Sequence, residues 1–247
     1  MSADLASTLN PDQYEALQLV LSGKTVYLSG RPGTGKTHAT KVIIAKLREL
    51  YPDGVMVVAP TGVAALNLGG QTIHAKPGPG VPQGTTENFT RVMRSTENAK
   101  LWRGENKPGN GVEVLVIDEF SMIDAQFLDW YYESVKRLRG CVQVVLIGDF
   151  SQLPPIGELR AVSLNSESYL ESCKSNIKWL PYGIKECTGK YGFQSACWRE
   201  LDIQTVELTH VHRTRDTLLL TALDDIRAGD GNTRSIQQLV AATRRTL

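Results

Sequence analysis

Residues 30–37 read Gly30-Arg31-Pro32-Gly33-Thr34-Gly35-Lys36-Thr37 and match the phosphate-binding P-loop pattern at every fixed position. Residues 25–29 before them form a short apolar run, as expected of a buried strand. Residues 36–50 after them predict a helix with one apolar stripe, made of Val42, Ile43, Leu47 and Leu50. Because strand, glycine-rich turn and helix are the context that the pattern requires, the stretch predicts a site for a nucleoside triphosphate. A glycine-rich turn that merely precedes a helix is the alternative.

The residue types in this stretch suit a polyphosphate chain. Glycines let backbone N–H groups turn toward phosphate oxygens, and the N-terminus of the following helix adds positive potential. We therefore assign nucleotide binding to all eight residues, Gly30, Arg31, Pro32, Gly33, Thr34, Gly35, Lys36 and Thr37. Lys36 would reach the β- and γ-phosphates, and the hydroxyl of Thr37 would help to hold Mg²⁺.

The composition is that of an ordinary globular protein. The chain has 247 residues, of which 41% are hydrophobic and 21% charged, enough for a full core. Its 27 basic and 26 acidic residues leave a formal charge of +1, so any argument for nucleic acid must come from local sites. The sequence has no apolar run of membrane-spanning length, and its first ten residues carry no base. We therefore expect an intracellular protein with no membrane partner and no secretory signal.

The four cysteines, at positions 141, 173, 187 and 197, include no Cys-x-x-Cys pair. The last three could be combined with His210 and His212 into a zinc site, but the spacings fit no common zinc motif. Reduced and partly buried thiols are the better interpretation.

Cap and turn signals divide the rest of the chain into alternating helices and strands. A helix with a capping box begins at Asn10-Pro11-Asp12-Gln13 and ends near Gly23. Another follows Asp124 and ends at Gly140. We also expect strands over 55–59, 112–117, 142–147 and 205–209, and a helix over 218–226. Strands that are apolar throughout predict a parallel sheet with helices on both faces, whose ligands bind at the carboxyl ends of the strands.

Asp118 and Glu119 directly follow the predicted strand at 112–117. In a P-loop ATPase this place holds a carboxylate for the Mg²⁺ shell, here Asp118, and a carboxylate that orients and deprotonates the attacking water, here Glu119. A kinase must exclude water, so the glutamate indicates a hydrolase. An acidic cap on the next turn is the alternative for either acid alone.

Residues 148–155 close the strand at 142–147 and bring the amide of Gln152 near the expected γ-phosphate. Gln152 could sense that phosphate or position water. A surface loop glutamine is the alternative.

Five segments in order resemble the Pif (petite integration frequency) family of superfamily 1 DNA helicases, whose nearest relatives are the RecD-like helicases. These segments are 30–37, 59–74, 117–122, 148–155 and 211–213. Residues 193–198 also resemble the stretch that precedes the arginine motif of this family. The resemblance spans residues 9 to about 229.

The resemblance implies a RecA-like P-loop fold. Residues 1–213 would form the first RecA-like ATPase domain, with an insertion at 78–111 where the family places a wedge subdomain. Residues 214–247 would form a linker helix and the truncated start of a second RecA-like domain, so we expect a fragment. In the insertion, a solvated loop face is the alternative; its basic and aromatic residues are Arg91, Arg94, Lys100, Trp102, Arg103 and Lys107.

The resemblance also implies an activity, namely ATP-driven 5′-to-3′ translocation on single-stranded DNA with unwinding of duplex at forks. ATP would be hydrolysed to ADP with Mg²⁺, by a monomer that serves genome maintenance through DNA repair, recombination and telomere maintenance. The compartment would be the nucleus or mitochondrion in a eukaryote and the cytoplasm in a bacterium.

Individual roles follow from the resemblance. Gln13 resembles the glutamine that reads adenine, Gln152 the contact that couples nucleotide state to DNA, and Arg213 an arginine finger. The segment 61–74 holds the DNA backbone in this family, through Thr61, Gly62, Asn67, Thr72 and His74. Small residues allow close approach there, and hydroxyl, amide and imidazole groups suit phosphates. A structural histidine at 74 and a surface ion pair at 213 are the alternatives.

Some positions depart from the family pattern. Arg31 and Pro32 replace small residues, Ser151 stands where an aromatic residue is common, and Thr214 where glutamine is common. None of these changes removes a catalytic group.

Two other functions stay open. A P-loop small-molecule kinase or NTPase would leave the segment 61–74 and Gln152 without purpose. A nucleotide-dependent DNA-binding adaptor is disfavoured by the intact Lys36, Asp118 and Glu119, whereas the truncated second domain expected from the resemblance favours it. Stimulation of ATP hydrolysis by single-stranded DNA would separate the motor from the kinase.

Overall fold

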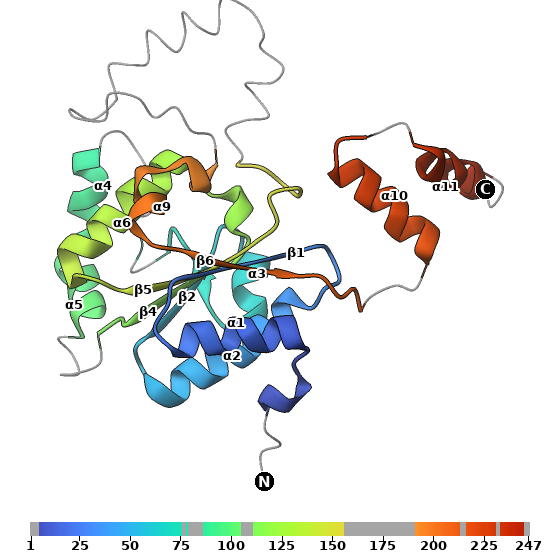
Figure 1. Ribbon diagram of the computed structural model, residues 1–247. Helices are drawn as coiled ribbons and strands as arrows, with labels where there is room; N and C mark the ends of the chain where they lie inside the picture. The colour runs from blue at the N-terminus through green and yellow to red at the C-terminus, as the bar shows by residue number, and fades with distance from the viewer. Residues whose placement is uncertain are drawn as a thin grey trace, which may run out of the picture. The chain divides into compact units, whose positions relative to one another are not determined.

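The computed structural model describes residues 5–75, 78, 86–104, 111–155, 191–212, 216–230 and 233–244 (Figure 1). The chain forms two compact units. The first comprises Met1–Gly30 and Lys36–Leu208, and the second comprises Arg31–Gly35 and Thr209–Leu247.

The first unit is built on a six-stranded sheet with the order β3-β2-β4-β5-β1-β6, in which every pairing is parallel. Its strands are β1 Val26–Gly30, β2 Val55–Ala59, β3 Gln71–Thr72, β4 Val114–Ile117, β5 Gln143–Ile147 and β6 Gln204–Leu208. The predicted parallel α/β fold is therefore confirmed. Strand β3 was not predicted, because two residues are too few to show a periodic pattern.

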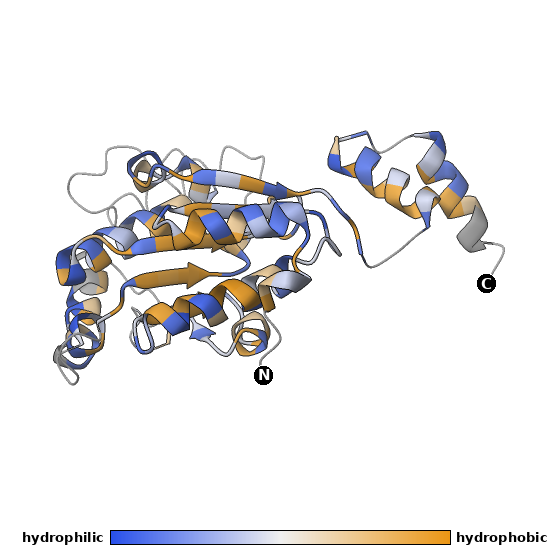
Figure 2. Ribbon diagram, turned by 60° about the horizontal axis from the view of Figure 1, so that its bottom comes forward, coloured by the Kyte–Doolittle hydropathy of each residue, from blue (hydrophilic) through white to orange (hydrophobic). Residues whose placement is uncertain are grey.

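Successive residues of the inner strands point into two different cores. In β4, Leu115 and Ile117 belong to one apolar cluster, whereas Val114 and Val116 belong to the other. Because both faces are covered, these strands consist mainly of apolar residues, and the strands of the sheet in Figure 2 are mostly orange. The edge strand β6 instead exposes Thr205 and Glu207.

Helices α1 (Pro11–Leu21) and α2 (Lys36–Leu50) belong to one of these cores. The predicted capping box of α1 is present, since the Asn10 side chain accepts from the Gln13 N–H and the Gln13 side chain accepts from the Asn10 N–H. The predicted stripe of α2 is buried except at Leu50, which is 57% exposed in the last turn. Leu50 is the last residue of α2 and lies outside the buried part of the stripe.

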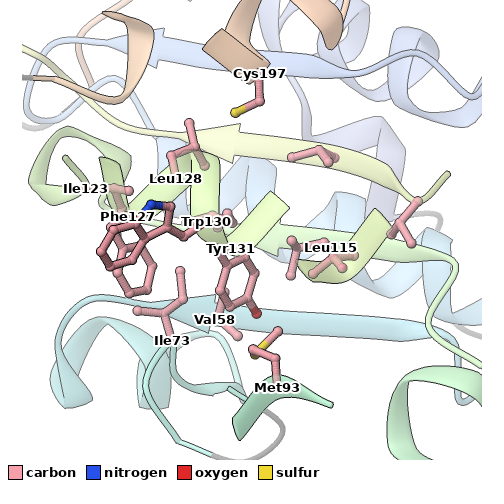
Figure 3. Packing of buried hydrophobic residues seen from close by; sticks show 14 of the residues in the cluster. Val58, Ile73, Met93, Leu115, Ile123, Phe127, Leu128, Trp130, Tyr131 and Cys197 are labelled. Atoms are coloured by element: carbon pink, nitrogen blue, oxygen red, sulfur yellow. The ribbon is translucent and has the colours of Figure 1, made fainter. Parts of the chain in front are cut away.

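The other core is organised by α6 (Ala125–Arg139), which Asp124 caps by accepting from the Phe127 N–H. Its apolar side chains are shown in Figure 3, with Phe127 and Tyr131 among them. The short helix α9 (Ala196–Glu200) packs on α6, and the Asp129 carboxylate of α6 accepts from the Cys197 N–H at 2.9 Å. Elements distant in sequence therefore share one core.

The described part of the insertion consists of two helices, α4 (Thr86–Met93) and α5 (Thr96–Arg103), which pack on α6. Trp102 is fully buried and meets the Tyr131 ring edge-on at 6.2 Å between centroids. The Trp102 ring therefore fills the core and adds no aromatic surface to the insertion. Arg91, Arg94 and Lys100 are exposed, and Lys107 lies outside the described residues.

The second unit contains helices α10 (Thr217–Arg227) and α11 (Arg234–Arg244), which pack on each other. Helix α10 confirms the prediction over 218–226. Asp216 caps it by accepting from the Leu219 N–H. Helix α11 was not predicted as a helix.

Candidate nucleotide and DNA site

Three neighbouring strands bring polar residues to the same edge of the sheet. Strand β4 ends before Asp118, strand β5 ends before Gly148 and Asp149, and strand β1 leads to the helix that begins with Lys36. Because β5 pairs with both β4 and β1, and all three strands are parallel, these ends lie side by side (Figure 1). The structure thus brings the predicted catalytic residues of the first unit to one edge.

Lys36 lies at the start of α2. Its ammonium group donates to the carbonyl oxygen of Gly30 at 2.5 Å, and its charge opposes the rise in the pKa of Asp118 that burial causes. The Lys36 side chain is therefore directed back over the end of β1, toward the acidic turn after β4. Thr37 is exposed beside it.

The segment Arg31–Gly35 belongs to the second unit. Gly33 and Gly35 have φ values of 87° and 84°, which only glycine adopts without strain, so the loop backbone depends on them. The Gly33 carbonyl accepts from the His212 N–H at 2.8 Å. The Arg31 guanidinium lies 2.5 Å from the Asp224 carboxylate of α10. Arg31, which departs from the family pattern, therefore has a partner within its own unit.

The carboxyl group of Asp118 is poised for a cation. Burial, together with the charge of Glu119, raises its pKa to about 6, although Lys36 acts in the opposite direction. A divalent cation would relieve the cost of ionising this group. Thr37 and Asp118 supply hydroxyl and carboxylate oxygens, which are hard donors of the kind that Mg²⁺ prefers. The residues present therefore fit Mg²⁺.

Glu119 has φ 50° and ψ 42°, a left-handed conformation that is unfavourable for a residue with a side chain. Such strain costs about 1–3 kcal/mol and persists only where the surroundings enforce it. Here the buried ring of Phe120 anchors the turn, stacked on Trp198 at 5.7 Å and edge-on to Phe150 at 5.9 Å. A side chain at Gly192 would overlap the Phe120 ring. Packing thus holds Glu119 in place.

Asp149 organises the loop after β5, a role that sequence reasoning missed. It is 1% exposed and accepts from the Ser151 N–H at 3.1 Å and from the Gln152 side-chain amide at 3.0 Å. Gln152 itself is exposed. The signal was an acidic residue close behind a buried strand, separated from it only by Gly148, much like the signal that identified Asp118.

Gln13 already has a structural role. It is 2% exposed, and its side-chain oxygen accepts from the Asn10 N–H at 3.1 Å. Its predicted reading of adenine stays a prediction.

The segment 61–74 begins at the carboxyl end of β2, at the same edge of the sheet. The Thr61 hydroxyl caps α3 (Gly62–Asn67) by accepting from the Ala64 N–H at 3.3 Å. Asn67 is exposed, and a side chain at Gly62 would meet no atom.

The end of this segment packs on the core. Thr72 lies in β3, and the His74 ring lies edge-on to Phe127 at 5.1 Å. Both residues are partly accessible. The predicted DNA contacts thus lie on one short helix with its N-cap, on the strand that follows it, and just after that strand.

The remaining predictions concern an arginine, the cysteines and metal binding. Arg213, Cys173 and Cys187 lie outside the described residues. Cys197 is buried in the core, which raises the pKa of its thiol to about 12, whereas the thiol of Cys141 is exposed. Within the described ranges, no group of three or more His, Cys, Asp and Glu residues is arranged to bind a metal. No helix in that part of the chain has the length and apolarity to cross a membrane.

Comparison with known proteins finds similar proteins that are all DNA helicases. The profile of the family described as PIF1-like helicase matches residues 8–177. The ATP-dependent DNA helicase PIF1 of Candida albicans is 34% identical over 232 residues, which cover 91% of this chain and 23% of that protein. The chain spans about a quarter of the length of the curated relatives it matches.

Solved structures of Pif1 helicases are also similar to this chain. The crystal structure of Pif1 helicase from Candida albicans matches with a TM-score of 0.74 and 31% identity, over 93% of this chain and 46% of that chain. The structure of Bacteroides Pif1 bound to ssDNA matches with a TM-score of 0.66 and 26% identity, over 94% of this chain and 49% of that chain.

Proposed function

The chain belongs to the PIF1-like helicase family, and on this premise we propose that it is an ATP-hydrolysing motor domain of a 5′-to-3′ DNA helicase. The proposal rests above all on one observation. Lys36, Asp118 and Glu119 meet at one edge of the sheet, beside the loop that carries Gln152. A site that only bound nucleotide would not need the strained Glu119.

In the proposed reaction, residues 30–37 bind the phosphates and Gln13 binds adenine. Thr37 and Asp118 would hold Mg²⁺, which neutralises charge on the β- and γ-phosphates. Lys36 leaves the Gly30 carbonyl and binds the terminal phosphate. Glu119 orients the attacking water and accepts its proton.

Two further groups complete the proposed reaction. Arg213 stabilises the charge of the transition state. Gln152 contacts the γ-phosphate and transmits its loss to the DNA segment.

Single-stranded DNA and DNA forks are the proposed partners. Thr61, Gly62, Asn67, Thr72 and His74 would contact the DNA backbone, so the Thr61 hydroxyl would serve both its helix cap and a phosphate. We assign residues 1–213 to the first motor domain and 214–247 to a linker helix and the start of a second. The proposed protein acts inside the cell as a monomer, in DNA repair, recombination and telomere maintenance.

The test is ATP hydrolysis by the chain with and without an oligothymidylate. We expect a low rate that single-stranded DNA raises, with Lys36→Ala as the inactive control. Phosphate transfer to a small hydroxyl compound would instead support a kinase. DNA binding without any turnover would support an adaptor.

A further inference from the structure

Residues 191–198 carry two aromatic rings that stack on each other at the surface of the first unit. The ring centroids of Tyr191 and Phe193 are 5.4 Å apart, and the rings lie within 7° of parallel. Phe150, from the loop that carries Gln152, lies edge-on to the Phe193 ring at 4.7 Å. Phe193 is 39% exposed, so part of this aromatic surface is open to a ligand.

The backbone beneath the two rings is fixed by hydrogen bonds and packing. The Tyr191 N–H donates to the side-chain oxygen of Gln194 at 2.9 Å, and the Gly192 N–H donates to the Ile123 carbonyl at 2.9 Å. A side chain at 192 would overlap the Phe120 ring, so glycine lets this turn lie directly on the core. Rings held in place before binding lose little conformational entropy when a ligand stacks on them.

The turn that carries the stacked pair and the segment 61–74 both contact the N-terminal end of α6. Gly192 bonds to Ile123, just before the helix, and His74 packs on Phe127 in its first turn. Ile123 and Phe127 belong to one apolar cluster together with Ile73 (Figure 3). The aromatic pair therefore continues the proposed DNA-binding segment around the end of α6.

We propose that Tyr191 and Phe193 form a base-stacking platform for single-stranded DNA, an inference that rests on the function proposed above. Every nucleobase has a π-face, so stacking holds a single strand without reading its sequence. Through Phe150, the platform also touches the loop of the proposed γ-phosphate contact, Gln152. A base on the platform thus lies one ring away from that loop.

Binding of a fluorescent oligothymidylate of about 16 nucleotides at low salt tests the platform. Losing one base–aromatic stack should weaken binding roughly 5- to 150-fold in Phe193→Ala. Phe193→Tyr should bind like the wild type, since it keeps a π-face. Phe193→Leu should be as weak as Phe193→Ala, because an aliphatic side chain does not stack.

Tyr51→Ala is the matched control, since Tyr51 is 38% exposed and lies just before β2, at the opposite edge of the sheet. It should leave DNA affinity unchanged. The affinity for ATP should be the same in Phe193→Ala and the wild type. A loss of ATP affinity in that variant would place a nucleotide base, not DNA, on the rings.

Two further measurements separate a loss of base stacking from a loss of folding. With an abasic oligonucleotide, the difference between the wild type and Phe193→Ala should disappear. Photocrosslinking of an iodouridine-substituted strand to the wild-type chain should label the peptide with residues 191–193.

The outcomes separate the two proposals. Wild-type binding with an unaffected Phe193→Ala, or with Phe193→Leu equal to the wild type, overturns the platform alone. Crosslinks that are confined to other peptides would also overturn the platform alone. Failure of the wild-type chain to bind any single strand at low salt overturns the proposed DNA function, and the platform with it.

Discussion

The turns after β4 and β5 lie side by side but are held in place by different means. The turn at Asp118–Phe120 is strained at Glu119 and fixed by buried aromatic rings. The turn at 148–152 has no residue in the left-handed region. Its Phe150 packs on the Phe120 ring, but hydrogen bonds to Asp149 hold Ser151 and Gln152, and Gln152 is exposed. Rigid packing suits a carboxylate that must hold water in one place, whereas a hydrogen-bonded loop can exchange partners when a phosphate arrives or leaves.

The largest expected effect is at Glu119. Glu119→Gln keeps the size of the side chain but cannot accept the proton of water, so hydrolysis should fall about 10²–10⁴-fold. ATP affinity should stay close to that of the wild type, because packing still holds the turn. The turnover of radiolabelled ATP measures the hydrolysis rate, and equilibrium binding measures the affinity for ATP. Normal turnover in Glu119→Gln would show that this turn takes no part in ATP hydrolysis.

Asp118 provides a prediction about pH. Its pKa in the folded chain, about 6, exceeds its ordinary value of 3.8, so the ionised form destabilises the fold above pH 6. Without divalent cations at pH 8, Asp118→Asn should raise the free energy of unfolding by up to about 3 kcal/mol. The gain should shrink as pH falls through 6 and vanish below about pH 4.

Urea unfolding at a series of pH values measures this gain. The exposed Asp53→Asn is the charge-matched control. A gain that does not change with pH would contradict the assigned burial of the Asp118 charge.

A substitution outside the turn after β4 should disturb the packing that holds this turn. Gly192→Ala should displace the Phe120 ring, cost about 1–3 kcal/mol of stability and slow hydrolysis. Adding Phe120→Leu makes room for the new methyl group, so the double variant should be more stable than the sum of the single effects predicts. Thermal unfolding and ATP turnover of all three variants measure the coupling. Strict additivity would mean that Gly192 does not act through Phe120.

The smallest effect is expected in the β5 turn. Asp149→Asn removes one of the two acceptor oxygens that hold Ser151 and Gln152, so DNA should stimulate hydrolysis several-fold less. The rate without DNA should change little. Ser151→Ala is the control, because Asp149 binds the backbone N–H of that residue. Unchanged stimulation in Asp149→Asn would leave Gln152 as an ordinary surface residue.

The sequence predicted those features that depend on local hydrogen bonding and on burial of whole strands. The capping box at Asn10, the cap at Asp124 and the start of α2 at Lys36 are all present, because each is decided within a few residues. The parallel sheet followed from strands that are apolar on both faces.

Features that depend on contacts between distant segments were missed. The strain at Glu119 arises from packing of Phe120 on Trp198, far along the chain. The burial of Trp102 against α6 could not be inferred from its charged neighbours in the sequence. The role of Asp149 depends on how the loop after it folds back.

The strand order has a consequence for the growing polypeptide. Strand β1, made before β5 and β6, lies between them, and its partners in the ladder are residues 145–147 and 204–208. The ribosome must therefore finish most of the first unit before this strand gains both neighbours. Long-range pairing of this kind slows folding and leaves an apolar strand unprotected meanwhile. Chaperone demand during translation should accordingly end only after Leu208 has emerged.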